Sequence, residues 1–191
     1  MSKLVPQTSA MKSNSYHFIT HWTIAASPAQ VYEILEQAER LPEWWPAVYL
    51  AVVTTKENDE TGTGREISLY TKGWLPYTLR WQSRLVAKNP PYGFSIEAFG
   101  DLMGSGTWTF EPDKSGRYCH ITYDWQVAAN KPILRYFSFL LKPLFSANHH
   151  WAMRTGEQSL RLELRRRNAK TPEELNQIPA PPQPTFSWLL K

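Results

Sequence analysis

Hydrophobic and polar residues alternate over residues 16–24, near the start of the chain. The apolar positions of this segment are Tyr16, Phe18, Trp22 and Ile24. His17 and His21 occupy the positions between them. Because successive side chains of a strand point to opposite faces, this period of two predicts a strand with one buried face.

Residues 25–48 carry the signals of two short helices. Ser27 and Pro28 form a helix start, with serine as the N-cap and proline at the first helical position. An apolar stripe follows, formed by Val31, Ile34 and Leu35. Pro42 and Pro46 then bracket a second, very short helical turn.

Strand signals dominate the region from residue 48 to residue 128. Alternation is clearest in YTLRWQSRLVAKN (77–89) and in RYCHITYDWQVAA (117–129). In the first of these, the apolar face is predicted to hold Tyr77, Leu79, Trp81, Leu85 and Ala87. Polar turns such as NDETGTG (58–64) separate the strands. Six or seven strands at hairpin spacing predict one continuous antiparallel sheet.

A helical pattern covers residues 132–167. The apolar positions that recur at intervals of three and four are Leu134, Phe137, Leu141, Leu144, Phe145, Ala152 and Leu160. This spacing predicts one long helix.

The segments that flank residues 16–167 differ from them in composition. Residues 1–15 are polar and predict a loosely attached or disordered segment, and residues 168–191 form a proline-rich tail that is expected to be extended. Residues 16–167 are therefore expected to form one domain.

The order of elements is a strand, two short helices, further strands and a long helix. Such a sheet can bury its inner face if the long helix lies across it, with a cavity left between them. This order, with ASPAQVYEILEQAERLPEWWPAV at residues 26–48, resembles the START-like (SRPBCC) superfamily, and more narrowly its polyketide cyclase/dehydrase and lipid-transport group. The resemblance covers about residues 16–167, and Tyr32 stands where that group usually has tryptophan. It implies an α+β helix-grip fold, in which a curved antiparallel sheet of six to seven strands wraps around the C-terminal helix.

Composition and charge narrow the classes of function. The single cysteine, Cys119, excludes an internal disulfide and a multi-cysteine metal site. Residues 1–15 lack the apolar segment of a secretion signal, and no run reaches the ~18 apolar residues of a spanning helix. A cytoplasmic protein is expected, with transient membrane contact left open. The net charge is +4, and the basic run 161–167 is typical of a solvated helix end, so nucleic acid is not an expected partner.

The aromatic residues, among them nine tryptophans, are expected to line the cavity. The side chains predicted to point inward are Trp22, Leu69, Trp81, Phe94, Ile96, Trp108, Phe110, Tyr123, Trp125, Leu141, Phe145, Asn148 and Ala152. In the helix-grip fold the short helices close one end of the cavity, which places Trp44 and Trp45 at its lid or rim. A mostly aromatic lining suits a lipid, a quinone or an aromatic polyketide. Whether the cavity is open or filled by these rings is not decided by the pattern.

The sequence contains few signals of catalysis. It has no nucleophile motif, phosphate-binding loop or dinucleotide fingerprint, and no cofactor is expected. His149 and His150 point about 100° apart on a helix, so this pair cannot chelate one metal ion. Two functions remain: binding or carriage of a hydrophobic small molecule, and a cyclase- or aromatase-type enzyme acting on such a ligand. For the enzyme, the candidate proton-transfer groups are Tyr77, Tyr123, Asn148 and His149.

Overall fold

The computed structural model describes residues 15–129 and 138–186, which form an α+β fold. The elements follow in the order β1 (Ser15–Ile24), α1 (Pro28–Glu36), the 3₁₀ helix η1 (Ala38–Arg40), α2 (Leu41–Trp44), β2 (Tyr49–Lys56), β3 (Glu66–Lys72), β4 (Thr78–Asn89), β5 (Gly93–Gly100), β6 (Leu102–Pro112), β7 (Cys119–Ala129), α4 (Ser138–Asn168) and α5 (Pro172–Asn176). This order confirms the predicted succession of strand, short helices, strands and long helix. The predicted N-terminal segment lies almost wholly outside the described residues.

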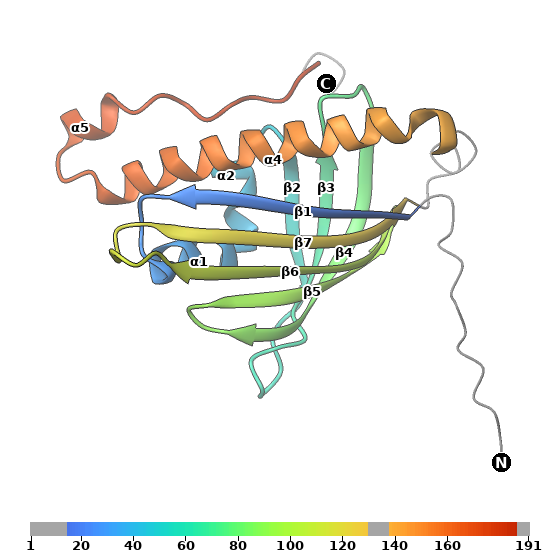
Figure 1. Ribbon diagram of the computed structural model, residues 1–191, viewed down its shortest axis with the longest axis horizontal. Coiled ribbons are helices and arrows are strands. Elements are labelled where there is room, and N and C mark those ends of the chain that lie inside the picture. The colour runs from blue at the N-terminus through green and yellow to red at the C-terminus, as the bar shows by residue number, and fades with distance from the viewer. Residues whose placement is uncertain (1–14, 130–137, 187–191) are drawn as a thin grey trace.

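The seven strands form one antiparallel sheet in the order β1-β7-β6-β5-β4-β3-β2. Strands β2 to β7 follow one another as hairpins. The last strand, β7, also pairs with the first strand, β1, which forms one edge of the sheet. The sheet is strongly curved and α4 lies across it (Figure 1). Met153, Leu160 and Leu164 of α4 belong to the same buried core as the inner face of the sheet. The helix-grip prediction is confirmed.

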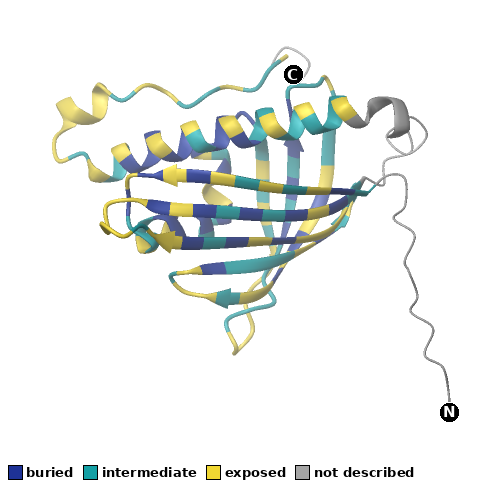
Figure 2. Ribbon diagram, viewed as in Figure 1, coloured by how far each residue is buried: buried dark blue, intermediate teal, exposed yellow. Residues whose placement is uncertain are grey.

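Burial alternates along the strands as the sequence pattern predicts (Figure 2). In β7 the buried set is Cys119, Ile121, Tyr123, Trp125 and Val127. In β4 the alternation holds as far as Leu85, where a register shift lies between Leu85 and Ala87. Ala87 is exposed, so its predicted place on the inner face was wrong. One extra residue in a strand turns the side chains that follow it to the other face.

The predicted helix start at Ser27 is present with both halves of a capping box. The N–H of Gln30 donates to the Ser27 hydroxyl at 3.3 Å, and the N–H of Ser27 donates to the Gln30 side-chain oxygen at 2.9 Å. These bonds satisfy backbone donors that the first turn of a helix leaves without a partner. The stripe on α1 is buried, with Val31 and Ile34 fully enclosed. The capping box therefore closes the first turn of a helix whose apolar stripe packs into the core.

Helix α4 is tied to the rest of the domain by its basic end. The start of the predicted helix, residues 132–137, lies outside the described residues. Arg161 donates to the carbonyl of Thr23 on β1 at 2.7 Å. Arg167 lies 3.0 Å from the carboxylate of Glu163 and 3.3 Å from that of Glu33 on α1. Part of the basic run thus holds α4 to its neighbours, in addition to facing solvent.

The residues after α4 turn back along this helix (Figure 1). Thr171 caps α5 by accepting the N–H of Glu174 at 3.2 Å, so the prediction of an extended tail was wrong for this segment. Its threonine, proline and acidic residues carry the signal of a helix start. Residues 177–186 follow as a segment that we call the C-terminal strap. Arg166 donates to the carbonyl of Pro179, and Thr185 contacts Lys72 at the end of β3.

Within residues 15–129 and 138–186, no helix is both long enough and apolar enough to cross a membrane.

Candidate functional site

Two cavities lie on the inner side of the sheet. The first, which we call the short-helix cavity, lies against α1, η1 and α2 and has a volume of about 70 Å³. The second, the long-helix cavity, lies against α4 and has a volume of about 160 Å³. A dry protein cavity of roughly 150 Å³ can hold benzene. The long-helix cavity therefore has room for at least a ring-sized portion of a ligand.

Four aromatic residues line both cavities and separate them: Trp45, Tyr49, Trp81 and Tyr123. The indole N–H of Trp45 donates to Thr155 of α4 at 3.3 Å, and that of Trp81 donates to Thr71 of β3 at 3.0 Å. These bonds fix the orientation of the two largest rings. The two cavities are therefore neighbours that share these four side chains.

The two phenols of this wall are held by ring packing. Tyr123 stacks on Trp108 with ring centroids 4.0 Å apart and an angle of 14° between the rings. Tyr49 meets Trp45 edge-on at 5.1 Å. Burial raises the pKa of Tyr49 and of Tyr123 above the usual value of a phenol. Both hydroxyls are therefore neutral near pH 7 and can donate or accept a hydrogen bond.

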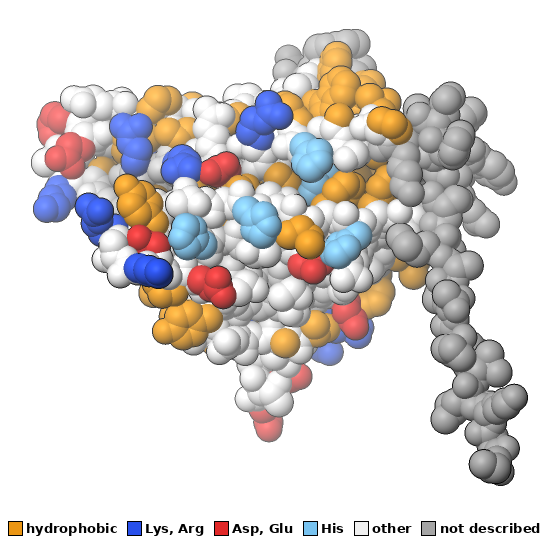
Figure 3. Space-filling model, viewed as in Figure 1, with side chains coloured by type: hydrophobic (Ala, Val, Ile, Leu, Met, Phe, Trp, Pro, Cys, Tyr) orange, Lys and Arg blue, Asp and Glu red, His pale blue; other side chains and the backbone are white. Residues whose placement is uncertain are grey.

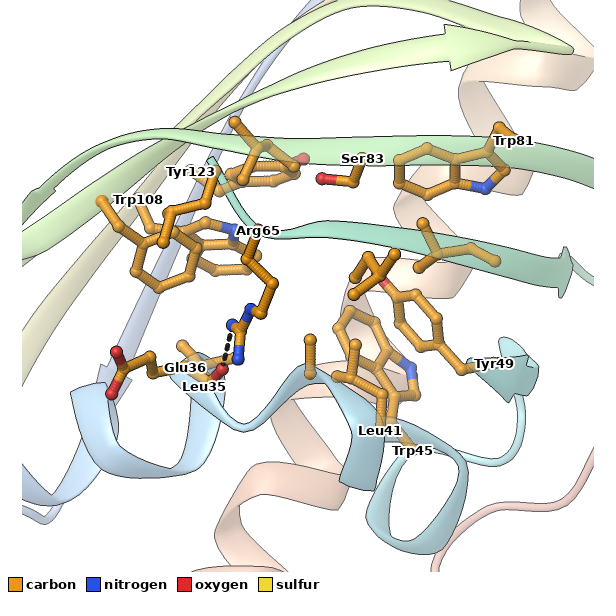
Figure 4. Close-up of a pocket in the computed structure, with 16 residues that line it drawn as sticks. Leu35, Glu36, Leu41, Trp45, Tyr49, Arg65, Trp81, Ser83, Trp108 and Tyr123 are labelled. Atoms are coloured by element: carbon orange, nitrogen blue, oxygen red, sulfur yellow. Dashed lines mark hydrogen bonds between the residues drawn. The ribbon is translucent and has the colours of Figure 1, made fainter. Parts of the chain in front are cut away.

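Most of the predicted lining residues face one of the cavities. Those that line the short-helix cavity are Trp45, Leu69, Trp81, Phe94, Ile96, Trp108 and Tyr123 (several are labelled in Figure 4). Those that line the long-helix cavity are Trp45, Trp81, Tyr123, Trp125, Phe145, Asn148 and Ala152, and the candidate proton-transfer groups Tyr77 and His149 line it as well. The side chain of Leu141 lies outside the described part of the chain.

Three predicted lining residues belong to the packed core instead. Trp22 packs against Trp45 and Trp108 at centroid distances of 6.0 and 5.5 Å, and Phe110 is fully buried. Trp44 is 1% exposed and Trp45 is 2% exposed, so the prediction that this pair lies at a lid or rim was wrong. Large rings fill core volume efficiently. The two tryptophans therefore differ in place, because Trp44 fills the core while Trp45 divides the cavities.

His149 is held in the long-helix cavity by an aromatic stack. Its ring lies 4.0 Å from that of Phe18 on β1, with 13° between the planes. Its Nε2 is buried and has no hydrogen-bond partner among the described residues. Burial, with a smaller contribution from His150, lowers the pKa of His149 to about 4. The imidazole is consequently neutral at pH 7 and offers the cavity a hydrogen-bonding group without a charge.

The strand histidines lie on the outer face of the sheet, away from both cavities (Figure 3). His17 contacts Asp124 at 3.0 Å, and His120 contacts Thr23 at 3.3 Å. Across residues 15–129 and 138–186, no three His, Cys, Asp or Glu side chains are placed to hold a metal ion. Cys119 is buried, and burial raises its pKa to about 11, so it is a neutral thiol near pH 7.

Two cations that were missing from the predicted lining face the cavities. Arg65 reaches the short-helix cavity and donates to the carbonyl of Glu36 at 2.6 Å (Figure 4). It has the same strand parity as Ile67 and Leu69, so the alternation could have indicated it. Lys72 lines the long-helix cavity and is only 4% exposed. Its neighbour Thr71 is buried too, so two consecutive residues of the strand are both enclosed. A strand pattern places one of two consecutive residues inward, so no local signal could have identified Lys72.

Comparisons with known proteins agree with this architecture. The family model described as "polyketide cyclase / dehydrase and lipid transport" matches residues 24–154, which span the strand end, the short helices, the remaining strands and the half of α4 that lines the cavity. A search of curated proteins gives no significant match.

Solved structures share the fold at low sequence identity. The Zhui aromatase/cyclase of Streptomyces sp. R1128 is 15% identical with a TM-score of 0.63, covering 82% of this chain and 97% of its own. TTHA0849 of Thermus thermophilus is 18% identical with a TM-score of 0.60, covering 76% and 97%. A point mutant of norcoclaurine synthase from Thalictrum flavum is 15% identical with a TM-score of 0.55, covering 78% and 96%. At these identities the likeness establishes the fold and no more.

Proposed function

Because the chain belongs to the polyketide cyclase/dehydrase and lipid transport family, we propose that it binds or carries a hydrophobic small molecule beneath α4. The observation that carries this proposal is the pair of cavities divided only by aromatic side chains. Rings that can stack on a ligand and move apart suit a flat or elongated apolar molecule. Lipids, quinones and aromatic polyketide-like compounds have this shape and chemistry.

The polar groups of the long-helix cavity favour binding over catalysis. Tyr77, Asn148 and His149 face it, and no carboxylate is among the lining residues that the structure describes. Burial raises the pKa of Tyr77 to about 12 and lowers that of His149 to about 4. General acids and bases work best when their pKa lies near the working pH, and neither group meets this condition. These groups are better suited to orienting a ligand through hydrogen bonds.

A cyclase- or aromatase-type enzyme is the second candidate. It is favoured by the convergence of Tyr77, Asn148 and His149 on one cavity, and by the fold that the chain shares with the Zhui aromatase/cyclase. In such an enzyme the cavity would fold a reactive chain, and these groups would move protons between its atoms. The two candidates differ in one measurable property, the chemical fate of the bound molecule.

Filling the long-helix cavity tests the first candidate. We expect Ala152→Phe to weaken binding of the neutral fluorescent probe N-phenyl-1-naphthylamine by about tenfold or more, since the new ring occupies apolar space that the probe would bury. Ala147→Phe is the matched control, because Ala147 lies exposed on the same helix. The assay is a titration followed by probe emission and tryptophan quenching, with thermal unfolding to verify that both variants are folded.

Equal probe affinity in wild type and both variants would contradict cavity binding. Mass spectrometry of ligand that copurifies with the native protein then separates the two candidates. A carrier returns that ligand chemically unchanged after incubation. An enzyme converts it, and His149→Gln or Tyr123→Phe lowers the turnover by roughly 10²–10⁴-fold while binding persists.

A further inference from the structure

Lys72 is a buried cation at the end of β3, on the lining of the long-helix cavity. Its backbone N–H donates to the carbonyl of Val48 at 2.9 Å, which fixes the residue at this place in the sheet. Its Nζ contacts two oxygens of Thr185 in the C-terminal strap, the carbonyl oxygen and, at 3.2 Å, Oγ1. Among the described residues it forms no ion pair with a carboxylate. Lys72 is 4% exposed, and no carboxylate of the described residues lies beside its ammonium as a countercharge.

A buried ammonium without an anion is costly, because water is lost and only neutral oxygens replace it. Burial accordingly lowers the pKa of Lys72 below its usual value. Structural lysines in protein interiors are normally paired with a carboxylate. Lys72 lines a ligand-sized cavity, so an anion bound there would complete such a pair.

The strap contacts that cover Lys72 are few and replaceable. Thr185 Oγ1 lies 3.1 Å from the carbonyl oxygen of Trp74 and 3.4 Å from that of Gly73. The ring of Phe186 lies 5.6 Å from Nζ and is 42% exposed. All these partners are neutral, so a charged oxygen would bind the ammonium more strongly than they do.

We propose that Lys72 anchors the carboxylate of an amphipathic ligand whose apolar body occupies the long-helix cavity, and that this carboxylate replaces Thr185 at the ammonium. The inference rests on the proposed binding function and assigns its ligand class as hydrophobic carboxylic acids. Tyr77 and Asn148, which line the same cavity, add neutral hydrogen-bond donors and bring no competing negative charge.

The test compares 2-naphthoate with its neutral counterpart 2-naphthamide by titration calorimetry on the full chain at pH 7. We expect wild type to prefer the acid by about tenfold or more, which corresponds to ~1.4 kcal/mol or more. Lys72→Met should remove this preference while keeping the affinity for the amide, and Lys72→Arg should keep the preference. Lys56→Met is the matched control, because Lys56 is an exposed lysine on the adjacent strand β2. Thr185→Val should strengthen acid binding alone, since it removes the hydroxyl bonds that hold the strap at Nζ.

An unchanged preference for the acid in Lys72→Met overturns the anchor while leaving the proposed function intact. Equal affinity of wild type for the acid and the amide likewise overturns the anchor and leaves the proposed function intact. If neither compound binds and the neutral probe N-phenyl-1-naphthylamine also fails to bind, the proposed function itself is wrong, and the anchor with it. If Lys72→Met does not fold, retention of the preference in Lys72→Arg and its increase in Thr185→Val still decide the matter, and failure of both overturns the anchor.

Discussion

Acidification from pH 7 to pH 5 should destabilise the fold through His149. In the folded protein its pKa is lowered to about 4, whereas an unfolded chain has the usual histidine value of about 6.5. Below pH 6.5 the unfolded state binds a proton that the folded state does not bind. The free energy of unfolding therefore falls as the pH decreases from about 6.5 to about 4, and the full stability is present above that range.

The size of this effect follows from the two pKa values. Each pH unit between them contributes about 1.4 kcal/mol, so the loss at pH 5 is about 2 kcal/mol and the limit is about 3 kcal/mol. The imidazole is enclosed against Phe18, its Nε2 lacks a partner among the described residues, and its neighbour His150 adds a repulsive charge when protonated. Among the described residues, the other titratable groups that line the cavity are phenols and the cation Lys72, and none of these supplies a negative charge near neutral pH.

Urea unfolding at pH 7, 6 and 5 measures this effect. We expect His149→Gln to lose about 2 kcal/mol less than wild type between pH 7 and pH 5, because the variant has no imidazole to protonate at this site. The control is His120→Gln, which removes an exposed histidine from the outer face. The carboxylate of Glu39 has a lowered pKa and loses its stabilising contribution only below about pH 4.5, outside this window. Identical pH profiles for wild type and His149→Gln would refute the reasoning.

Two further substitutions test the packing that shapes the site. Gly156→Ala should lower the free energy of unfolding by about 1–3 kcal/mol in urea titrations, because a Cβ would lie 2.6 Å from Cε2 of the dividing ring Trp45. The control Gln158→Ala changes an exposed residue of the same helix and should have little effect. Equal stability of the two variants would contradict this packing. Ser27→Ala should cost about 1 kcal/mol by removing the cap of α1, and an unaltered midpoint of thermal unfolding would show that the capping box contributes nothing.

Local sequence patterns predicted most of the elements and their buried faces, because these depend on near neighbours along the chain. Alternation in β1 and β7 depends on the two-residue repeat of a strand, and the start of α1 depends on a serine and a proline placed next to each other. The order of these elements, with the motif of residues 26–48, carried the resemblance to the family. Even Arg65, directly before β3, continues the alternation of that strand. Local patterns could not predict the register shift before Ala87, because the extra residue is defined only by the pairing of β4 with β5.

Which inward side chains border a cavity and which pack against one another depends on the tertiary structure. Trp44 and Trp45 are adjacent, yet one fills the core and the other divides two cavities, because the curvature of the sheet and the position of α4 set what each ring contacts. Lys72 is buried by Thr185, 113 residues later, when the strap folds back along α4. Strand parity states only the direction of a side chain. Its surroundings depend on segments that are distant in the sequence, and so the cavities and their buried cation were visible only in the folded chain.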